Sequence, residues 1–246
     1  KKYRTEYHWR DILQRDSILE LIQRYLHLEV EHIKDGNGRR INTKRKLIIP
    51  RYHQLGAVRL LTERVLEDGV GHNYLVQHSA GSGKSNTIAW LSYRLATLLN
   101  AEEQRIFDSV VVITDRRVLD SQLQSTITQF KHEPGFVVPI KKDSAQLAEK
   151  LEAGSRIIIT TLQKFPFVLD QIEALPRRRY AVLVDEAHSS QTGETVKQMK
   201  AVLRGMSQEE YDNMEAEDAI RASMEARGRQ ENLSFFAFTA TPKAKT

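Results

Sequence analysis

The chain has 246 residues, of which 40% are hydrophobic and 28% charged, a composition typical of soluble globular proteins with one large domain or two small ones. It contains no cysteine, which excludes disulfides and thiolate metal sites. No apolar run approaches the ~18 residues that a membrane-spanning helix needs, and the N-terminus does not lead into a signal-peptide core. We therefore expect a cytoplasmic protein with no membrane partner.

The formal net charge of +5 is distributed unevenly. The first 60 residues hold 14 Lys and Arg against 7 Asp and Glu, whereas the rest of the chain is slightly acidic. The basic residues of this lead include Arg39-Arg40 and Lys44-Arg45-Lys46, set among glycines. Such a patch can hold a nucleic-acid backbone by releasing counterions. A solvated linker between domains is an equally good interpretation.

The first elements in the chain are predicted to be helical. Apolar residues such as Ile18 and Ile22 recur near helical spacing and predict an amphipathic helix over residues 11–33. An Asp-Gly-Asn-Gly sequence at 35–38 ends this pattern, and a second helix is predicted over 50–68. Residues 1–49 are therefore expected to form a helical, basic connecting segment before the main domain.

The rhythm then changes to short apolar strands separated by helices. The predicted strands are residues 74–77, 109–114, 157–160, 181–184 and 235–239. Helices are predicted between them over 85–99 and 117–130. This alternation implies an α/β fold with a mainly parallel central sheet, right-handed crossovers and flanking helices. Residues 206–231, with eight acidic and three basic side chains, are expected to form an exposed helix or mobile excursion between two core strands.

A glycine-rich segment, residues 78–85, follows the first of these strands and opens a helix, which is the context that a phosphate loop requires. Lys84 would reach the β and γ phosphates of ATP, and the Ser85 hydroxyl would coordinate Mg²⁺. His78 stands where the usual pattern has its first glycine. The alternative is a glycine-rich turn without a ligand. The predicted nucleotide-binding residues of this loop are Gly81, Ser82, Gly83, Lys84 and Ser85.

A pair of carboxylates, Asp185 and Glu186, ends the apolar strand at 181–184. Asp185 would hold Mg²⁺, and Glu186 would orient or polarise the attacking water. Alone, such a pair is often only a helix cap, but its pairing with Lys84 and Ser85 in one open sheet favours catalysis. His188 is expected either to couple this site to a neighbouring element or to close the turn.

A third element, Thr239-Ala240-Thr241-Pro242, ends the last predicted strand. Hydroxyls at the carboxyl edge of a parallel sheet lie near its ligand crevice, so Thr239 and Thr241 are candidates for coupling. A strand that simply ends in a proline turn is the alternative.

The order of these three elements resembles motifs I, II and III of superfamily-two helicases. The resemblance identifies the fold as a RecA-like P-loop domain over residues 50–246. It extends to Arg51-Tyr52-His53-Gln54, in which the resemblance implies that Gln54 reads the adenine edge. A glutamine on an exposed helix face is the alternative.

Two further segments resemble the family's motifs Ia and Ib, at residues 112–119 and 159–165. In the family these loops contact the nucleic-acid backbone. The resemblance therefore implies phosphate contacts, although each residue could also be an ordinary cap or surface charge. The candidate nucleic-acid-binding residues are Arg116, Arg117, Thr161 and Lys164.

Within the superfamily, the chain most resembles the motor subunit of type I restriction enzymes. The run Asp185-Glu186-Ala187-His188-Ser189-Ser190-Gln191-Thr192-Gly193, the segment Thr114-Asp115-Arg116-Arg117 and the phosphate loop carry this resemblance. It implies ATP hydrolysis that drives double-stranded DNA past the enzyme before endonucleolytic cleavage. The implied partners are a methylase, a specificity subunit and a second RecA-like lobe of the parent chain. The first lobe of another DEAH-type DNA or RNA helicase or remodeller is the alternative.

The sequence ends soon after its third motif, and we see no Asp and Glu-x-Lys arrangement typical of a metal-dependent nuclease. In the family the second lobe supplies an arginine that is worth about 10³–10⁵ in rate in related phosphoryl transfer. We therefore expect this chain to bind Mg·ATP weakly, to hydrolyse it poorly and not to cut DNA. A nucleotide-gated binding module is less consistent with Glu186, and a phosphate-loop kinase would leave the third motif unexplained.

Overall fold

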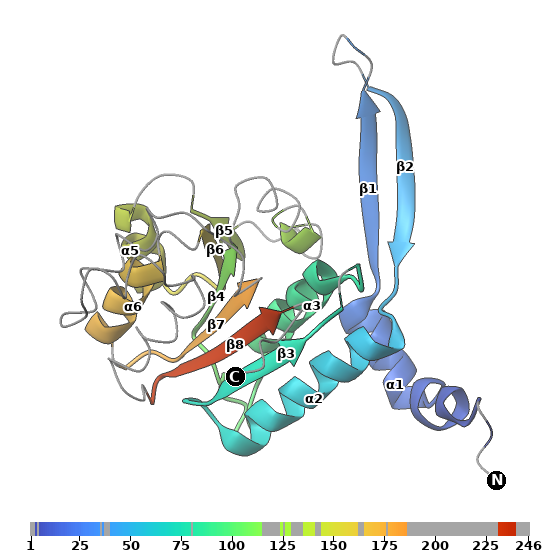
Figure 1. Ribbon diagram of the computed structural model, residues 1–246, viewed down its shortest axis with the longest axis horizontal. Coiled ribbons are helices and arrows are strands. Elements are labelled where there is room, and N and C mark those ends of the chain that lie inside the picture. Colours follow the sequence, from blue (N-terminus) through green and yellow to red (C-terminus); the bar gives the residue numbers. More distant parts are fainter. Residues whose placement is uncertain are drawn as a thin grey trace, which may run out of the picture.

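The computed structural model describes residues 3, 5–34, 36, 40–79, 81–114, 124, 126–128, 135–140, 144–161, 165–175, 177–185 and 231–239. Its centre is a parallel sheet, from which an antiparallel ribbon projects (Figure 1). The sheet contains β3 (Asn73–Gln77), β4 (Ser109–Thr114), β5 (Val137–Pro139), β6 (Ile157–Thr161), β7 (Tyr180–Asp185) and β8 (Leu233–Thr239), in the order β3-β8-β7-β4-β6-β5. None of the described helices is both long and apolar enough to pass through a bilayer.

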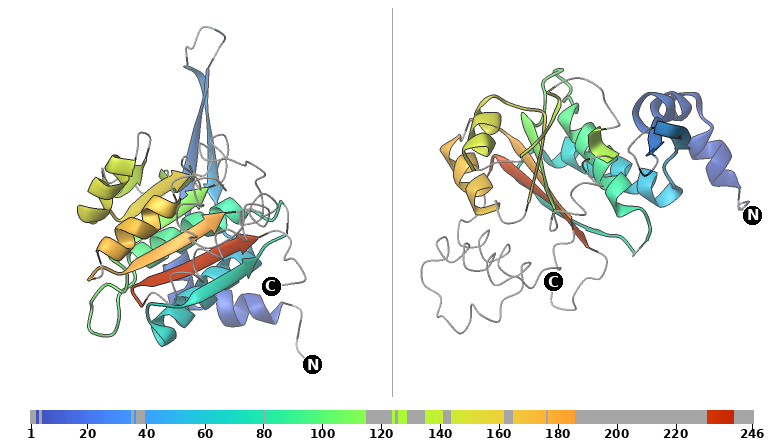
Figure 2. Two further views of the ribbon diagram at one scale, coloured as in Figure 1. Left: turned by 60° about the vertical axis from the view of Figure 1, so that its left-hand side comes forward. Right: turned by 90° about the horizontal axis from the view of Figure 1, so that it is seen from above.

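Helices cover both faces of the sheet, as the view from above shows (Figure 2). On one face lie α2 (Tyr52–Asp68) and α3 (Lys84–Ala96), and on the other α5 (Ser144–Glu152) and α6 (Phe165–Ala174). Because successive strand residues point to opposite faces, each strand divides its apolar side chains between two cores. In β4, Val110 and Val112 join the core under α2 and α3, whereas Val111 and Ile113 join the other core.

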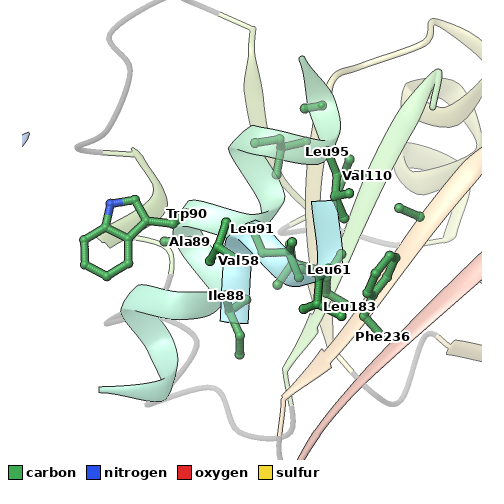
Figure 3. Packing of buried hydrophobic residues seen from close by; sticks show 14 of the residues in the cluster. Val58, Leu61, Ile88, Ala89, Trp90, Leu91, Leu95, Val110, Leu183 and Phe236 are labelled. Carbon is green, nitrogen blue, oxygen red and sulfur yellow. The ribbon is translucent and has the colours of Figure 1, made fainter. Parts of the chain in front are cut away.

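The core under α2 and α3 is built from helix residues three or four apart. Figure 3 shows Leu61 of α2 and Leu91 and Leu95 of α3 beside Val110, Leu183 and Phe236 of the sheet. Leu91 and Leu95 are completely buried. Full burial of a side chain of this size contributes roughly 1.5–3 kcal/mol, so this core fixes the position of the loop that precedes α3.

The predicted α/β fold is confirmed, including all five predicted strands, each within two residues of its observed bounds. The sequence did not indicate β5, which has only three residues and ends at Pro139. The helix predicted over 117–130 lies mostly outside the described residues, of which 124 and 126–128 are helical. The acidic segment 206–231 also lies outside them, apart from its last residue.

The predicted helix over residues 11–33 is wrong beyond Tyr25, in about its last third. Short helical turns run through η1 (His8–Ile12), α1 (Arg15–Glu20) and η2 (Leu21–Tyr25). Strand β1 (His27–Lys34) then pairs with β2 (Arg40–Ile48), so residues 1–49 are only partly helical. From Leu28 to Val30 the side chains alternate apolar, charged and apolar, and the Asp-Gly-Asn-Gly sequence at 35–38 is a hairpin turn signal. The turn signal and the alternation therefore determine the structure of residues 27–34, although their apolar side chains also recur near helical spacing.

The lead segment is fixed to α2 and α3, the two helices that cover one face of the sheet. The Trp90 indole N–H donates a hydrogen bond of 2.9 Å to the Tyr25 carbonyl, and both side chains are buried. Glu20 lies between two arginines, 2.8 Å from Arg59 of α2 and 3.8 Å from Arg94 of α3. These contacts join the end of the short helical turns, and hence the start of the ribbon, to α3.

Candidate active site

The carboxyl ends of β3, β8 and β7 lie side by side at one edge of the sheet. In the parallel register, Gln77 of β3 is opposite Thr239 of β8, and Asp185 of β7 is opposite Phe238. The backbone N–H of His78 extends this ladder with a 2.8 Å hydrogen bond to the Thr239 carbonyl. The topology therefore brings together the ends of three segments that are far apart in the sequence. Thr239 is buried between the other two.

The loop from β3 into α3 turns through two glycines with left-handed backbone conformations. Gly81 has φ +72° and Gly83 has φ +87°, and α3 begins at the next residue, Lys84. At Gly83 a β-carbon would lie 2.5 Å from the side-chain nitrogen of Gln54, whereas at Gly81 it would meet open space. Gly83 is therefore favoured by its backbone angle, and a larger residue there would force the Gln54 amide to move.

Gln54 is buried and ties the start of α2 to this loop. Its Oε1 accepts a 2.8 Å hydrogen bond from the Arg51 backbone N–H. Its Nε2 donates to the carbonyls of Gly83 and Ser82, at 2.9 Å and 3.3 Å. Both ends of the amide are engaged in holding the loop. The contact with adenine stays a prediction, because it requires this amide to exchange or share those partners.

Lys84 and Asp185 meet at the centre of the edge. Lys84 Nζ lies 3.1 Å from Asp185 Oδ1, and only 14% and 11% of these side chains are exposed. Lys84 is also the first residue of α3, where backbone N–H groups and the helix dipole favour an anion. The half-buried Ser85 follows it. Hydroxyl and carboxylate oxygens are ligands that suit Mg²⁺, and a lysine at a helix N-terminus suits phosphate, so these residues fit Mg·ATP.

Two histidines pack together here, His78 at the start of the loop and His53 in the first turn of α2. His78 Nδ1 and the Ser82 hydroxyl share a 3.0 Å hydrogen bond, while His53 Nε2 donates to the Ser82 carbonyl at 3.1 Å. The two imidazole centroids are 5.7 Å apart. The position of His53, one residue before Gln54, carried no separate sequence signal.

A cavity of about 530 Å³ opens beside the loop. Its lining includes Arg51, Tyr52 and His53 from the start of α2, and His78, Ser79 and Gly81 from the loop. Tyr52 is 75% exposed. The cavity has polar groups and aromatic rings next to the phosphate loop, which is the combination that a nucleoside needs.

The other predicted site residues are only partly placed. Thr161 ends β6, opposite Thr114 of β4, two strands away from Asp185 across the sheet. Its side chain is half-buried at the carboxyl edge. The remaining candidates, Glu186, His188, Arg116, Arg117, Lys164 and Thr241, lie outside the described residues, and their roles stay predictions.

The two buried histidines predict a pH dependence of stability. Burial lowers the pKa of His78 from its ordinary 6.5, and the positive charges of His53 and Lys84 lower it further. Burial also lowers the pKa of His27. Below about pH 6.5, the unfolded chain therefore binds more protons at these two histidines than the folded chain does. This contribution to stability is complete above pH 6.5 and is lost as the pH falls toward the folded pKa values.

We expect the free energy of unfolding, measured with urea, to decrease between about pH 7 and about pH 5.5. His78→Gln should flatten this profile, because the titrating group is removed. His8→Gln is the matched control, since His8 is exposed. Equal slopes for the His78 variant and the unchanged chain would contradict the assignment.

Comparison with known proteins gives a consistent family. The family model of the SWI2/SNF2 ATPase matches residues 53–209. The chain is 30% identical over 243 residues to the type I restriction enzyme HindI endonuclease subunit of Haemophilus influenzae, covering 94% of this chain and 20% of that protein. It is 28% identical over 163 residues to the C-terminal part of the putative type I restriction enzyme MpnIIP endonuclease subunit of Mycoplasma pneumoniae, covering 60% of this chain and 75% of the relative.

The chain thus spans about a fifth of the length of the Haemophilus relative. Solved structures of similar fold include the type ISP restriction-modification enzyme LlaGI in complex with a DNA substrate mimic. That match has a TM-score of 0.49 at 13% identity and covers 78% of this chain and 17% of LlaGI. The Pyrococcus furiosus Hef helicase domain matches with a TM-score of 0.43 at 14% identity, covering 80% of this chain and 34% of Hef. With its phosphate loop and paired carboxylate inside a family match that covers more than half of its length, the chain belongs to the SWI2/SNF2 ATPase family of superfamily-two helicases.

Proposed function

We propose that this chain is the ATP-binding lobe of a type I restriction motor subunit, which couples ATP hydrolysis to movement of duplex DNA. The observation that carries the proposal is the meeting of Lys84 with Asp185 at 3.1 Å, on the edge where β3, β8 and β7 end. Similarity to the restriction endonuclease subunits of Haemophilus influenzae and Mycoplasma pneumoniae supports the choice of motor.

Within this proposal, Lys84 contacts the β and γ phosphates of ATP, and the loop residues Gly81, Ser82 and Gly83 direct backbone N–H groups at them. Ser85 and Asp185 hold Mg²⁺, which neutralises charge that develops on the phosphates. Glu186 orients the attacking water. The close approach of Lys84 to Asp185 supports these roles, because one bound Mg·ATP can then contact both side chains.

Gln54 and the cavity beside it are proposed to receive adenine, so that the same amide senses the base and holds the phosphate loop. Thr239, Thr241 and His188 are proposed to couple the site to DNA. Thr239 is buried on β8, which pairs with both β3 and β7. This supports the proposal, because a movement of either strand would displace Thr239. The proposed contacts with the DNA backbone are Arg116, Arg117, Thr161 and Lys164.

The proposed partners are double-stranded DNA, a second RecA-like lobe, and the methylase and specificity subunits of a cytoplasmic restriction complex. The second lobe is expected to complete the ATPase by adding an arginine at the γ-phosphate. The alternative is a lobe of another helicase or remodeller of the same superfamily, which would use the same ATP site on a different nucleic acid.

The test compares ATP hydrolysis by this chain with that by a longer protein carrying both lobes, each with and without linear duplex DNA. We expect only the longer protein to turn over ATP efficiently, with stimulation by duplex. If RNA stimulates the longer protein and duplex DNA does not, the restriction motor is excluded and the helicase alternative stands. Efficient turnover by this chain alone would contradict the need for a second lobe.

A further inference from the structure

The β1–β2 ribbon extends away from the sheet and its covering helices in both side views (Figures 1 and 2). Its register runs from His27 opposite Ile48 to Lys34 opposite Arg40. At roughly 3.4 Å per residue, the nine residues of β2 span about 30 Å. Only the base of the ribbon is buried, at His27 and Ile48 among its described side chains.

An isolated two-stranded ribbon is marginally stable in water, and this one also exposes apolar side chains. Leu28 and Leu47, which are directly opposite each other, are 50% and 55% exposed. Neither packs into a core. A surface of this kind gains stability from a partner that covers it.

The charge of the ribbon indicates the chemistry of that partner. Residues 27–48 contain six Lys and Arg against three Asp and Glu. Lys44, Arg45 and Lys46 are consecutive on β2 and all exposed, and among the described residues none of the three takes part in an ion pair. Because side chains alternate along a strand, these cations project from both faces of the ribbon.

The register separates the two faces further. Lys46 is opposite Glu29, so its charge has an acidic neighbour on the same face. Arg45 is opposite Val30, and Leu28 and Leu47 share that face. One face therefore combines an uncompensated guanidinium with apolar side chains, whereas the other carries mixed charge.

We propose that the β1–β2 ribbon is an arm that holds duplex DNA, separate from the ATP site and from the motif loops. A two-stranded ribbon fits the major groove of B-form DNA, where the arginine can reach phosphates and the leucines can pack on sugars and thymine methyl groups. The uncompensated charge of Arg45 and the thin, extended shape of the ribbon favour duplex DNA as the ligand over a flat acidic protein surface. The proposal takes its ligand, duplex DNA, from the proposed function, but it requires no nucleotide.

The base of the ribbon gives the arm a fixed support on the body. Tyr25, two residues before β1, is completely buried and bonded through its carbonyl to Trp90 of α3. Glu20 adds its ion pairs to Arg59 and Arg94. DNA held on the ribbon would thus be held at a defined place relative to α3, the helix that begins at Lys84.

The test measures binding of a fluorescent 30-bp duplex of arbitrary sequence to the chain, by anisotropy over a series of salt concentrations and without nucleotide. In the variant Lys44→Ala/Arg45→Ala/Lys46→Ala we expect the Kd to rise at least about tenfold near 0.1 M salt. The slope of log K against log salt should become shallower by about 1, since each lost phosphate contact removes about 0.9 and Arg45 is the uncompensated cation.

The matched control is Arg64→Ala/Arg105→Ala/Arg177→Ala, which removes the same charge from exposed positions elsewhere. It should leave the Kd within about twofold, and circular dichroism should show both variants folded. The proposal of a DNA-binding arm would be overturned if the ribbon variant kept its affinity and salt slope. Equal losses of affinity in both variants would also overturn it. So would a loss of affinity for polyglutamate with duplex binding retained, which would indicate an acidic protein as partner.

The same measurements separate this proposal from the proposed function. The ribbon variant could lose duplex binding while duplex does not stimulate ATP hydrolysis by the two-lobed protein. In that case the proposal of a DNA-binding arm is supported and that of a restriction motor is contradicted. If duplex stimulates hydrolysis and the ribbon variant binds duplex normally, the restriction motor is supported and the DNA-binding arm is contradicted.

Discussion

Replacing Gly83 with alanine is expected to abolish nucleotide binding and to lower the free energy of unfolding by about 2–4 kcal/mol. Two effects combine at this position. The φ of +87° is in the left-handed region, which costs a residue with a β-carbon roughly 1–2 kcal/mol. The new methyl group would also lie 2.5 Å from Gln54 Nε2, so Gln54 must move and give up its bonds to the loop carbonyls. Urea unfolding and the Kd for a fluorescent ATP analogue would measure both losses.

Gly81→Ala is the matched control, because Gly81 has a similar φ of +72° but open space where the methyl group would lie. It should show only the backbone strain. The double variant Gln54→Ala/Gly83→Ala should recover part of the stability, since the clash is gone although the strain remains. Equal costs for Gly81→Ala and Gly83→Ala would show that the approach of Gln54 contributes nothing.

Local sequence patterns predicted the sheet well because its central strands, β4, β6, β7 and β8, are buried on both faces. The apolar runs at 109–114 and 181–184 leave no competing helical or alternating period, and the structure has strands there. The pairing of Lys84 with Asp185 was also foreseen in outline, since both follow strands of one parallel sheet. The strand order was not predictable from local pattern. β8 comes last in the chain yet lies between β3 and β7, where its Thr239 is held by the ladder.

The prediction failed where local signals conflicted. Residues 27–34 carry apolar side chains at spacings compatible with a helix, and their pairing with residues 40–48 depends on the turn between them. Contacts between residues far apart in the sequence could not be predicted from local patterns either. The predicted contact of Gln54 with adenine stays a prediction. Its bonds to Ser82 and Gly83 were not foreseen, because they join residues nearly thirty positions apart, which no periodicity encodes. The same holds for the packing of His53 beside His78.

Lys84→Ala is expected to lower ATP hydrolysis by the two-lobed protein at least about 10²-fold and to remove tight ATP binding by this chain. Removing a single preorganised donor to developing charge costs about 10²–10³ in rate, and Lys84 is the cation that an ion pair places beside Asp185. The variant also leaves a largely buried carboxylate without its lysine, which costs about 1–3 kcal/mol of stability.

These two consequences can be separated with Lys84→Ala/Asp185→Asn, in which the unpaired negative charge is also removed. We expect its unfolding free energy to return toward that of the unchanged chain, while ATP binding and hydrolysis stay lost. Recovery of hydrolysis in the double variant would mean that Lys84 serves only to neutralise Asp185. Continued loss in a protein of restored stability shows that the loss of function does not come from the unpaired carboxylate. It is the result expected if Lys84 contacts the phosphates and Asp185 holds Mg²⁺.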